Sequence, residues 1–177
     1  MASDEELFER LTSGDMKAFD RLYDRFERPV FGFILSQLGD SAEAEDALHE
    51  AFLTLLRQRR NTGEIHTFRA WFFTVARHVC LNRVRARKRA DRAVDVISSA
   101  PRGSCPPTPD QEIELKEKHM WLERAVRLLP PPLAEVYKLR ASGMSYAEVA
   151  TVLDLPIGTV KSRMHELIRC LRKGAAR

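Results

Sequence analysis

The sequence lacks the patterns of a disulfide framework, a metal knuckle and a membrane-spanning helix. Its three cysteines, Cys80, Cys105 and Cys170, are odd in number and far apart, which fits neither a disulfide framework nor a C-x-x-C metal site. No apolar run approaches the roughly 20 residues that a membrane-spanning helix needs. The N-terminus, MASDEELFERL, is acidic, unlike a signal peptide. We therefore expect a cytoplasmic chain that is not inserted in a membrane.

The sequence also lacks a recognisable catalytic constellation. Its scattered histidines form neither an H-E-x-x-H helix nor a Cys/His cluster: they include His49, His66, His78 and His119. Asp46 and Glu50 lie one helical turn apart, but no nucleophile or metal-spaced histidine accompanies them. Helix capping and solvation explain these two carboxylates. We expect no enzymatic activity, no metal and no cofactor.

The charge of the chain is unevenly divided. The net charge of +4 combines −8 over residues 1–56, +9 over 57–89, −2 over 90–120 and +5 over 121–177. Two basic regions separated by an acidic stretch indicate one polyanion that is held at two places. The acidic first region is then free to bind a different partner.

Apolar residues recur at helical spacing through most of the chain, which predicts an all-α fold. Helices are expected over residues 4–12, 16–38, 42–60, 67–89, 110–129, 133–142 and 146–153, and from Pro156 onward. Pro29 lies within the second of these and predicts a kink or a break there. The proline-rich composition of residues 90–109 is that of a linker. We therefore predict two small helical domains, 1–90 and 112–177, joined by a flexible linker, 91–111.

The most informative helix begins at Thr67 and ends in a run of arginines. Its apolar face includes Phe68 and Trp71, whereas Phe73 projects about 130° from the centre of that face. Arg69 and Arg77 lie one turn away on either side of Phe73. An aromatic ring outside the core can stack on bases while flanking arginines neutralise phosphates. The alternative is that Phe73 covers a neighbouring loop and the arginines are merely solvated; this helix alone leaves both open.

The last part of the chain has the pattern of a helix-turn-helix. Ser145 and Glu148 form an S-x-x-E capping box that opens a short helix. The segment Asp154-Leu155-Pro156 turns the chain into a longer helix, whose polar and basic residues lie outside near its N-terminal end. Such a second helix can lie in a DNA major groove. The alternative is a pair of antiparallel core helices with a charged outer face.

These stretches resemble a known family. EAEDALHEAFLTLLR, followed by FRAWFFTVARHVCLNRVRARKR, resembles the second conserved region of bacterial sigma factors. LPPPLAEVYKLRASGMSYAEVATVLDLPIGTVKSRMHELIRCLRKG resembles their fourth region. With only these two regions, the chain is similar to the extracytoplasmic-function (group 4) sigma factors of the sigma-70 family. The resemblance covers residues 4–89 and 120–173.

The resemblance implies a non-enzymatic subunit that binds core RNA polymerase and promoter DNA, with an anti-sigma factor as a possible further partner. The implied polymerase-docking residues are Asp46, His49, Glu50, Phe52 and Leu55. The implied contacts to the −10 element are Asn61, Phe68, Arg69, Trp71, Phe73, Arg77, His78, Arg83 and Arg85. The implied contacts to the −35 element are Thr159, Lys161, Ser162, Arg163 and His165. His49 and His78 depart from the family, which usually has glutamine and asparagine there.

Three alternatives predict different properties. A sigma mimic that titrates an anti-sigma factor would lack the basic residues that this chain keeps. A helix-turn-helix repressor would confine its basic charge to the C-terminal domain and bind a palindromic duplex. A nucleic-acid enzyme would need metal ligands or a nucleophile with its base.

Overall fold

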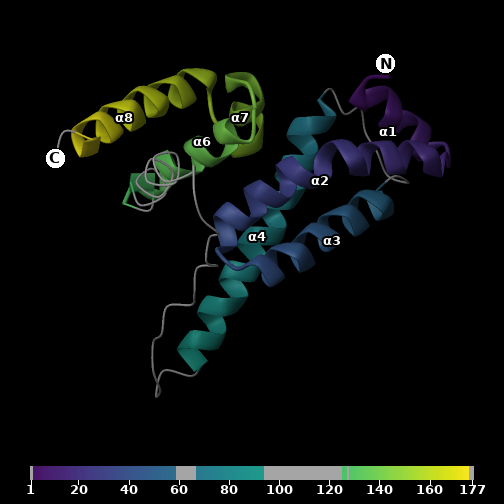
Figure 1. Ribbon diagram of the computed structural model, residues 1–177, viewed down its shortest axis with the longest axis horizontal. Coiled ribbons are helices and arrows are strands. Elements are labelled where there is room, and N and C mark those ends of the chain that lie inside the picture. The colour runs from purple at the N-terminus through teal and green to yellow at the C-terminus, as the bar shows by residue number, and fades with distance from the viewer. Residues whose placement is uncertain (1, 59–66, 94–124, 127, 176–177) are drawn as a thin grey trace, which may run out of the picture.

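The computed structural model describes residues 2–58, 67–93, 125–126 and 128–175, and within these ranges every regular element is an α-helix. The helices are α1 (Asp4–Thr12), α2 (Met16–Leu38), α3 (Ser41–Gln58), α4 (Phe68–Ala93), α6 (Pro131–Ala141), α7 (Tyr146–Leu153) and α8 (Ile157–Ala175) (Figure 1). The predicted all-α class is confirmed. The loop over residues 61–66, most of the helix predicted over 110–129 and nearly all of the predicted linker lie outside the described residues.

Local capping signals set the ends of the first helices. The Ser3 hydroxyl accepts a hydrogen bond from the Glu6 amide, and the Glu6 carboxylate accepts one from the Ser3 amide, so α1 begins with a capping box. Gly39 ends α2 with φ at 77°, a left-handed conformation that glycine adopts at little cost. Asp40 then accepts a hydrogen bond from the Glu43 amide at 2.8 Å and caps α3.

Pro29 does not divide α2. The helix is one element from Met16 to Leu38 with the proline inside it, so the break that the sequence allowed at this point is absent. Proline has no backbone N–H, and the carbonyl of Arg25 therefore lacks its usual helical partner. Packing against α1, α3 and α4 holds the helix together across this position.

An aromatic cluster forms the core of α1–α4. Phe68 of α4 lies 5.1 Å from Phe8 and 5.2 Å from Phe26, measured between ring centroids. Phe72, one turn further along α4, lies 4.9 Å from Phe52 of α3. Pairs at these distances add to the free energy gained by burying the rings. The first half of α4 is therefore fixed on three other helices.

Helices α1 to α4 form a first unit, and α6 to α8 form a second. The second unit has the helix-turn-helix that the sequence predicted. Gly143 follows α6 with φ at 81°, and the capping box of Ser145 and Glu148 opens α7. Asp154 adopts the left-handed conformation at the end of α7, and α8 follows directly after Pro156. Both α7 and α8 pack against α6.

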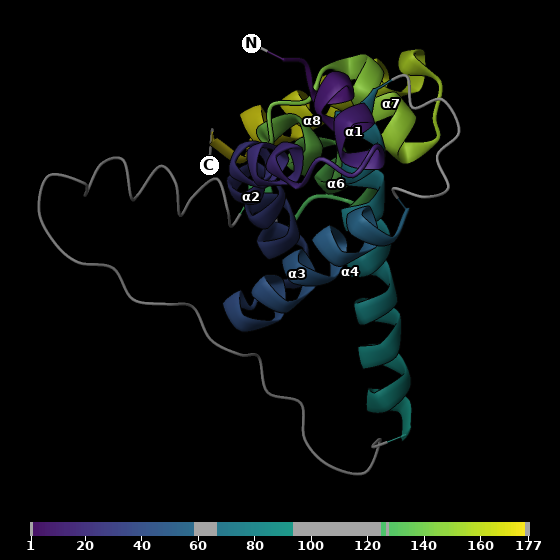
Figure 2. The same ribbon diagram turned by 90° about the vertical axis from the view of Figure 1, so that its right-hand side faces the viewer.

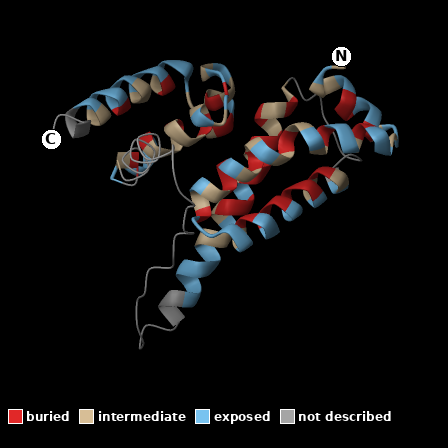
Figure 3. Ribbon diagram, in the orientation of Figure 1, coloured by how far each residue is buried: buried red, intermediate tan, exposed pale blue. Residues whose placement is uncertain are grey.

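The two units pack against each other. Helix α7 lies on α4, and α6 touches α2. One cluster of buried residues includes Phe73 of α4 together with Met144 and Val149 of the second unit. Figure 2 shows that the last part of α4 projects beyond the other helices, and in Figure 3 the turns of this part that precede its grey tip are coloured as exposed. Helix α4 thus has a covered half and a free half.

Candidate nucleic-acid interface

The free half of α4 presents a basic surface. Arg85, Lys88 and Arg89 are exposed and line a shallow hollow with Asn82. His78, on the preceding turns, is also exposed. Because the end of α4 projects beyond the other helices (Figure 2) and these four side chains are exposed, they are accessible to a polyanion.

Two further arginines of α4 are paired with the acidic helix α3. Arg83 lies 2.9 Å from a carboxylate oxygen of Glu50, and Arg87 is paired with Glu43. The opposite charges of the two sequence regions therefore partly neutralise each other. Exposed ion pairs of this kind contribute about 0–1 kcal/mol, so a phosphate can replace either carboxylate at little cost.

In the covered half of α4, two arginines contact the second unit. Arg77 Nε donates a hydrogen bond to Glu135 Oε1 of α6 at 2.6 Å. Arg69 Nη2 donates one to the carbonyl oxygen of Ser142 at 2.6 Å, and Arg69 Nε lies 4.0 Å from Glu148. Both predicted phosphate contacts are therefore engaged within the chain.

The prediction that Phe73 lies outside the core is wrong. Its side chain is 0% exposed, its ring stands edge-on to Phe33 of α2 at 5.5 Å, and the Arg69 guanidinium lies 5.9 Å from its centroid. The sequence showed one apolar face because periodicity reports only the largest one. Helix α4 is also covered on the side that carries Phe73, because α2 and α7 both pack on it.

The other two aromatic rings predicted to contact the −10 element differ from each other. Phe68 is 0% exposed and belongs to the core cluster, so the prediction that it contacts DNA directly is corrected. The Phe68 amide donates a hydrogen bond to a carboxylate oxygen of Glu5 at 3.1 Å, which caps α4 from α1. Trp71 keeps part of its surface exposed. Asn61 lies outside the described residues.

The outer face of α3 carries the predicted docking residues only in part. Asp46, His49 and Glu50 are exposed, whereas Phe52 is 4% and Leu55 0% exposed. The prediction that Phe52 and Leu55 contact the polymerase directly is therefore corrected, because both side chains lie on the inward apolar stripe of α3. Reasoning from the sequence missed Leu53, which is 50% exposed. Leu53 lies three residues after Glu50, so the two share one helix face. This spacing is the sequence signal from which Leu53 could have been identified.

The predicted recognition helix presents its polar residues outward. On α8, Lys161, Ser162 and His165 are exposed, and Thr159 and Arg163 are half-buried. The buried side of the same helix includes Val160 and Leu167. The N-terminal part of α8 is therefore amphipathic in the manner that major-groove binding requires.

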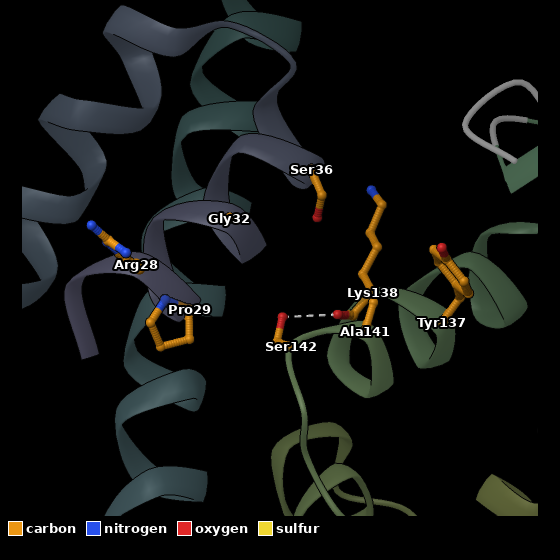
Figure 4. A pocket seen from close by; sticks show the side chains of 8 residues that line it. All are labelled: Arg28, Pro29, Gly32, Ser36, Tyr137, Lys138, Ala141 and Ser142. Carbon is orange, nitrogen blue, oxygen red and sulfur yellow. Dashed lines mark hydrogen bonds between the residues drawn. The ribbon is translucent and has the colours of Figure 1, made fainter. Parts of the chain in front are cut away.

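A crevice separates α2 from α6 (Figure 4). Lys138 reaches across it and donates a hydrogen bond from Nζ to Gln37 Oε1 at 3.2 Å, and burial lowers the pKa of this lysine. The Ser142 hydroxyl, at the same edge, donates to the Lys138 carbonyl oxygen. The lining residues are Arg28, Pro29, Gly32, Ser36, Tyr137, Lys138, Ala141 and Ser142. The contact between α2 and α6 at this point thus includes a hydrogen bond between side chains of the two helices.

Neither a metal site nor a membrane span is found in the part of the chain that the structure describes. No three histidine, cysteine or acidic side chains gather there in a way that could hold a metal ion. The described helices also include none that combines the length and the apolar character needed to cross a bilayer.

Comparison with known proteins gives consistent matches over both units. The family model for sigma-70 region 2 matches residues 22–90, and the model for sigma-70 region 4 matches residues 119–171. RNA polymerase sigma-H factor of Pseudomonas aeruginosa is 30% identical over 91% of this chain and 88% of its own length. ECF RNA polymerase sigma factor SigL of Mycobacterium tuberculosis is 30% identical over 85% of each chain. ECF RNA polymerase sigma-E factor of Escherichia coli is 29% identical over 92% of this chain and 88% of its own length.

Two solved structures share the fold. CnrH in complex with the cytosolic domain of CnrY superposes with a TM-score of 0.70 at 22% identity, covering 96% of this chain and 95% of CnrH. The sigma factor RpoE of Bartonella quintana, in complex with the anti-sigma factor NepR, gives a TM-score of 0.68 at 21% identity, covering 90% and 98%. At these identities the similarity concerns the fold alone.

Proposed function

The chain belongs to the extracytoplasmic-function sigma factors of the sigma-70 family, the promoter-recognition subunits of RNA polymerase, and from this premise we propose how its surfaces share that work. One observation carries the proposal: outward basic surfaces lie on α4 and α8, one in each unit, whereas the outer face of α3 carries the exposed carboxylates of Glu45, Asp46 and Glu50. Two nucleic-acid contacts and one protein contact therefore have separate places. The chain acts by binding and not as an enzyme, in the cytoplasm where the polymerase is.

Helix α4 binds the melted −10 element. Trp71 supplies an aromatic surface for an unstacked base, a contact worth about 1–3 kcal/mol. The arginines proposed to neutralise phosphates of the separated strands are Arg69, Arg77, Arg83 and Arg85. The exposed His78 is proposed as a further contact to the same DNA. The buried rings of Phe68 and Phe73 position the helix and do not contact the DNA.

Helix α8 reads the −35 element in duplex form. Its N-terminal turns carry the side chains that would reach the major groove: Thr159, Lys161, Ser162, Arg163 and His165. Arginine and lysine also contact phosphates, which fixes the register of the helix on the duplex. Binding at this place raises the effective concentration of α4 near the −10 element.

Helix α3 docks on core polymerase through its outer face. The exposed carboxylates of Asp46 and Glu50 suit a basic partner surface, and Leu53 adds exposed apolar area between charged neighbours. The comparison structures contain CnrH bound to the cytosolic domain of CnrY, and the sigma factor RpoE bound to the anti-sigma factor NepR. We extend this to a partner of the anti-sigma type for the present chain.

Run-off transcription with core polymerase and a library of promoter fragments tests this proposal. The wild-type chain should confer start sites that depend on an upstream and a downstream element. Arg163→Ala should weaken the dependence on the upstream element, whereas Arg169→Ala, a matched change at a 69% exposed arginine further along α8, should preserve it. A wild-type chain that stimulates no specific start site would refute the proposal and favour a sigma mimic or a repressor.

A further inference from the structure

We propose that Glu5 and Phe8 of α1 are positioning residues for Trp71: they hold the indole at the start of α4 in the orientation in which it stacks on an unpaired base. This inference rests on the proposed function of α4, in which Trp71 supplies the aromatic surface. Glu5 and Phe8 lie three residues apart and therefore share one face of α1. That face contacts the first turn of α4, where Phe68 and Trp71 lie.

The indole of Trp71 rests on buried rings. Its centroid lies 5.5 Å from that of Phe8 and 5.8 Å from that of Phe68, and these two side chains are 4% and 0% exposed. Trp71 itself is half-buried, so part of its surface remains accessible. Phe68 belongs to the same helix as Trp71, whereas Phe8 belongs to α1. The Phe8 ring therefore ties the orientation of the indole to a second helix.

Glu5 fixes the turn of α4 that carries Trp71. Phe68 is the first residue of α4, where backbone amides lack an acceptor within the helix, and its N–H donates to Glu5 Oε1 at 3.1 Å. In the same turn, the Trp71 amide donates to the Thr67 carbonyl oxygen at 3.1 Å. A carboxylate is also favourable at this end of the helix dipole. Loss of Glu5 therefore leaves an amide of this turn without its acceptor and loosens the backbone from which the indole projects.

Helix α1 is itself anchored, so that it can serve as a support. Arg25 of α2 donates from Nη1 to Asp4 Oδ1 at 2.6 Å and from Nη2 to the Ala2 carbonyl oxygen at 2.9 Å. Leu7 and Leu11 of α1 are 0% exposed. The bundle thereby fixes α1, and with it the face of α1 that contacts α4.

An indole that is already held binds a base more tightly than a mobile one, because it has less side-chain freedom to lose. Immobilising one side chain on binding weakens an affinity by about threefold to tenfold. A base that stacks on Trp71 avoids this loss while Phe8 and Glu5 hold the ring and its turn. The effect of changes in α1 should therefore appear in strand opening, the step in which unpaired bases are captured.

Fluorescence of the full chain, free of polymerase, tests whether α1 holds the indole. The sequence contains two tryptophans, Trp71 and Trp121, so Trp121→Phe leaves Trp71 as the single emitter. In this background, Phe8→Leu should increase the quenching of Trp71 by acrylamide. Phe19→Leu is the matched control, because its ring packs on Phe52 of α3, and it should leave the quenching unchanged. Equal quenching in the two variants would overturn the inference.

Open-complex formation by the reconstituted holoenzyme tests the Glu5 contact. The probe is a duplex promoter fragment that the wild-type chain selects in run-off transcription, and permanganate reactivity of unpaired thymines reports opening. Glu5→Ala should reduce opening about threefold to tenfold. Glu5→Gln keeps an oxygen that accepts from the Phe68 amide and should restore most of it. Glu9→Ala, at an exposed carboxylate of the same helix, should open as the wild type does; a loss equal to that of Glu5→Ala would count against the inference.

A double-mutant cycle in the same assay separates positioning from general stability. Phe8→Leu should impair opening when Trp71 is present and have no further effect in the Trp71→Ala background, because Phe8 acts through the indole. A contribution to stability alone would persist in both backgrounds, and that result would overturn the inference while leaving the proposed function intact. If Trp71→Ala opens as well as the wild type, or the wild-type chain selects no promoter, the proposed function fails and the inference falls with it.

Discussion

Replacement of Phe73 by alanine should destabilise the fold strongly, because the ring is fully enclosed. Its side chain is 0% exposed and stands edge-on to Phe33 at 5.5 Å. Truncation of a buried phenylalanine removes the transfer free energy of the ring and leaves a cavity, which together cost about 3–5 kcal/mol. For a chain of this size the midpoint of thermal unfolding should fall by about 6–20 °C.

Urea denaturation followed by circular dichroism measures this loss. The midpoint concentration should fall while the slope of the transition stays unchanged. Leu53→Ala is the control, because Leu53 is 50% exposed and its truncation should cost less than about 1 kcal/mol. If Phe73→Ala costs no more than this control, the ring is not enclosed in the free protein. The sequence-based prediction of an accessible ring would then be restored.

Two further predictions concern stability and thiol chemistry. In the capping box of α7, the Ser145 hydroxyl accepts a hydrogen bond from the Glu148 amide, and the Glu148 carboxylate accepts one from the Ser145 amide. Ser145→Ala removes the first of these bonds and should lower the free energy of unfolding by about 1 kcal/mol. An unchanged midpoint of thermal unfolding would contradict the cap. Burial raises the pKa of the Cys80 thiol from 9.0 to about 12, so iodoacetamide at pH 8 should modify half-exposed Cys170 well before Cys80, as peptide mass spectrometry can check. As the pH rises, the Cys80 thiol loses its proton in the unfolded chain before it does so in the folded one. Its contribution to the free energy of unfolding is therefore complete below about pH 9 and declines as the pH rises toward 12. Cys80→Ala should flatten that decline.

The described helices, and several of their ends, followed from the sequence because the signals are local. The predicted bounds of α1 and α2 agree with the structure, since a capping serine and a left-handed glycine each act within one turn. Ser145 likewise marked the start of α7. Helix α6, however, begins at Pro131, two residues before the predicted start, and α4 continues to Ala93, beyond the predicted end at residue 89. Signals of this kind require no knowledge of the tertiary structure.

The errors arose where contacts join distant parts of the chain. Phe73 is buried by packing of α2 and α7 on α4, and periodicity within one helix does not report a second covered face. Phe52 and Leu55 are a different case. The apolar stripe of α3 already placed them inward, and only the family resemblance suggested that they were docking contacts.

The continuity of α4 has a consequence for the order in which a strand is engaged. The helix has 26 residues without interruption, and Arg77 and Arg85 are separated by about 12 Å along its axis. A nucleic acid that first contacts the projecting end can bind there while Arg77 is still paired with Glu135. Under the proposed function, we expect a strand to replace these carboxylates in the order of their arginines along α4, Glu43 and Glu50 before Glu135.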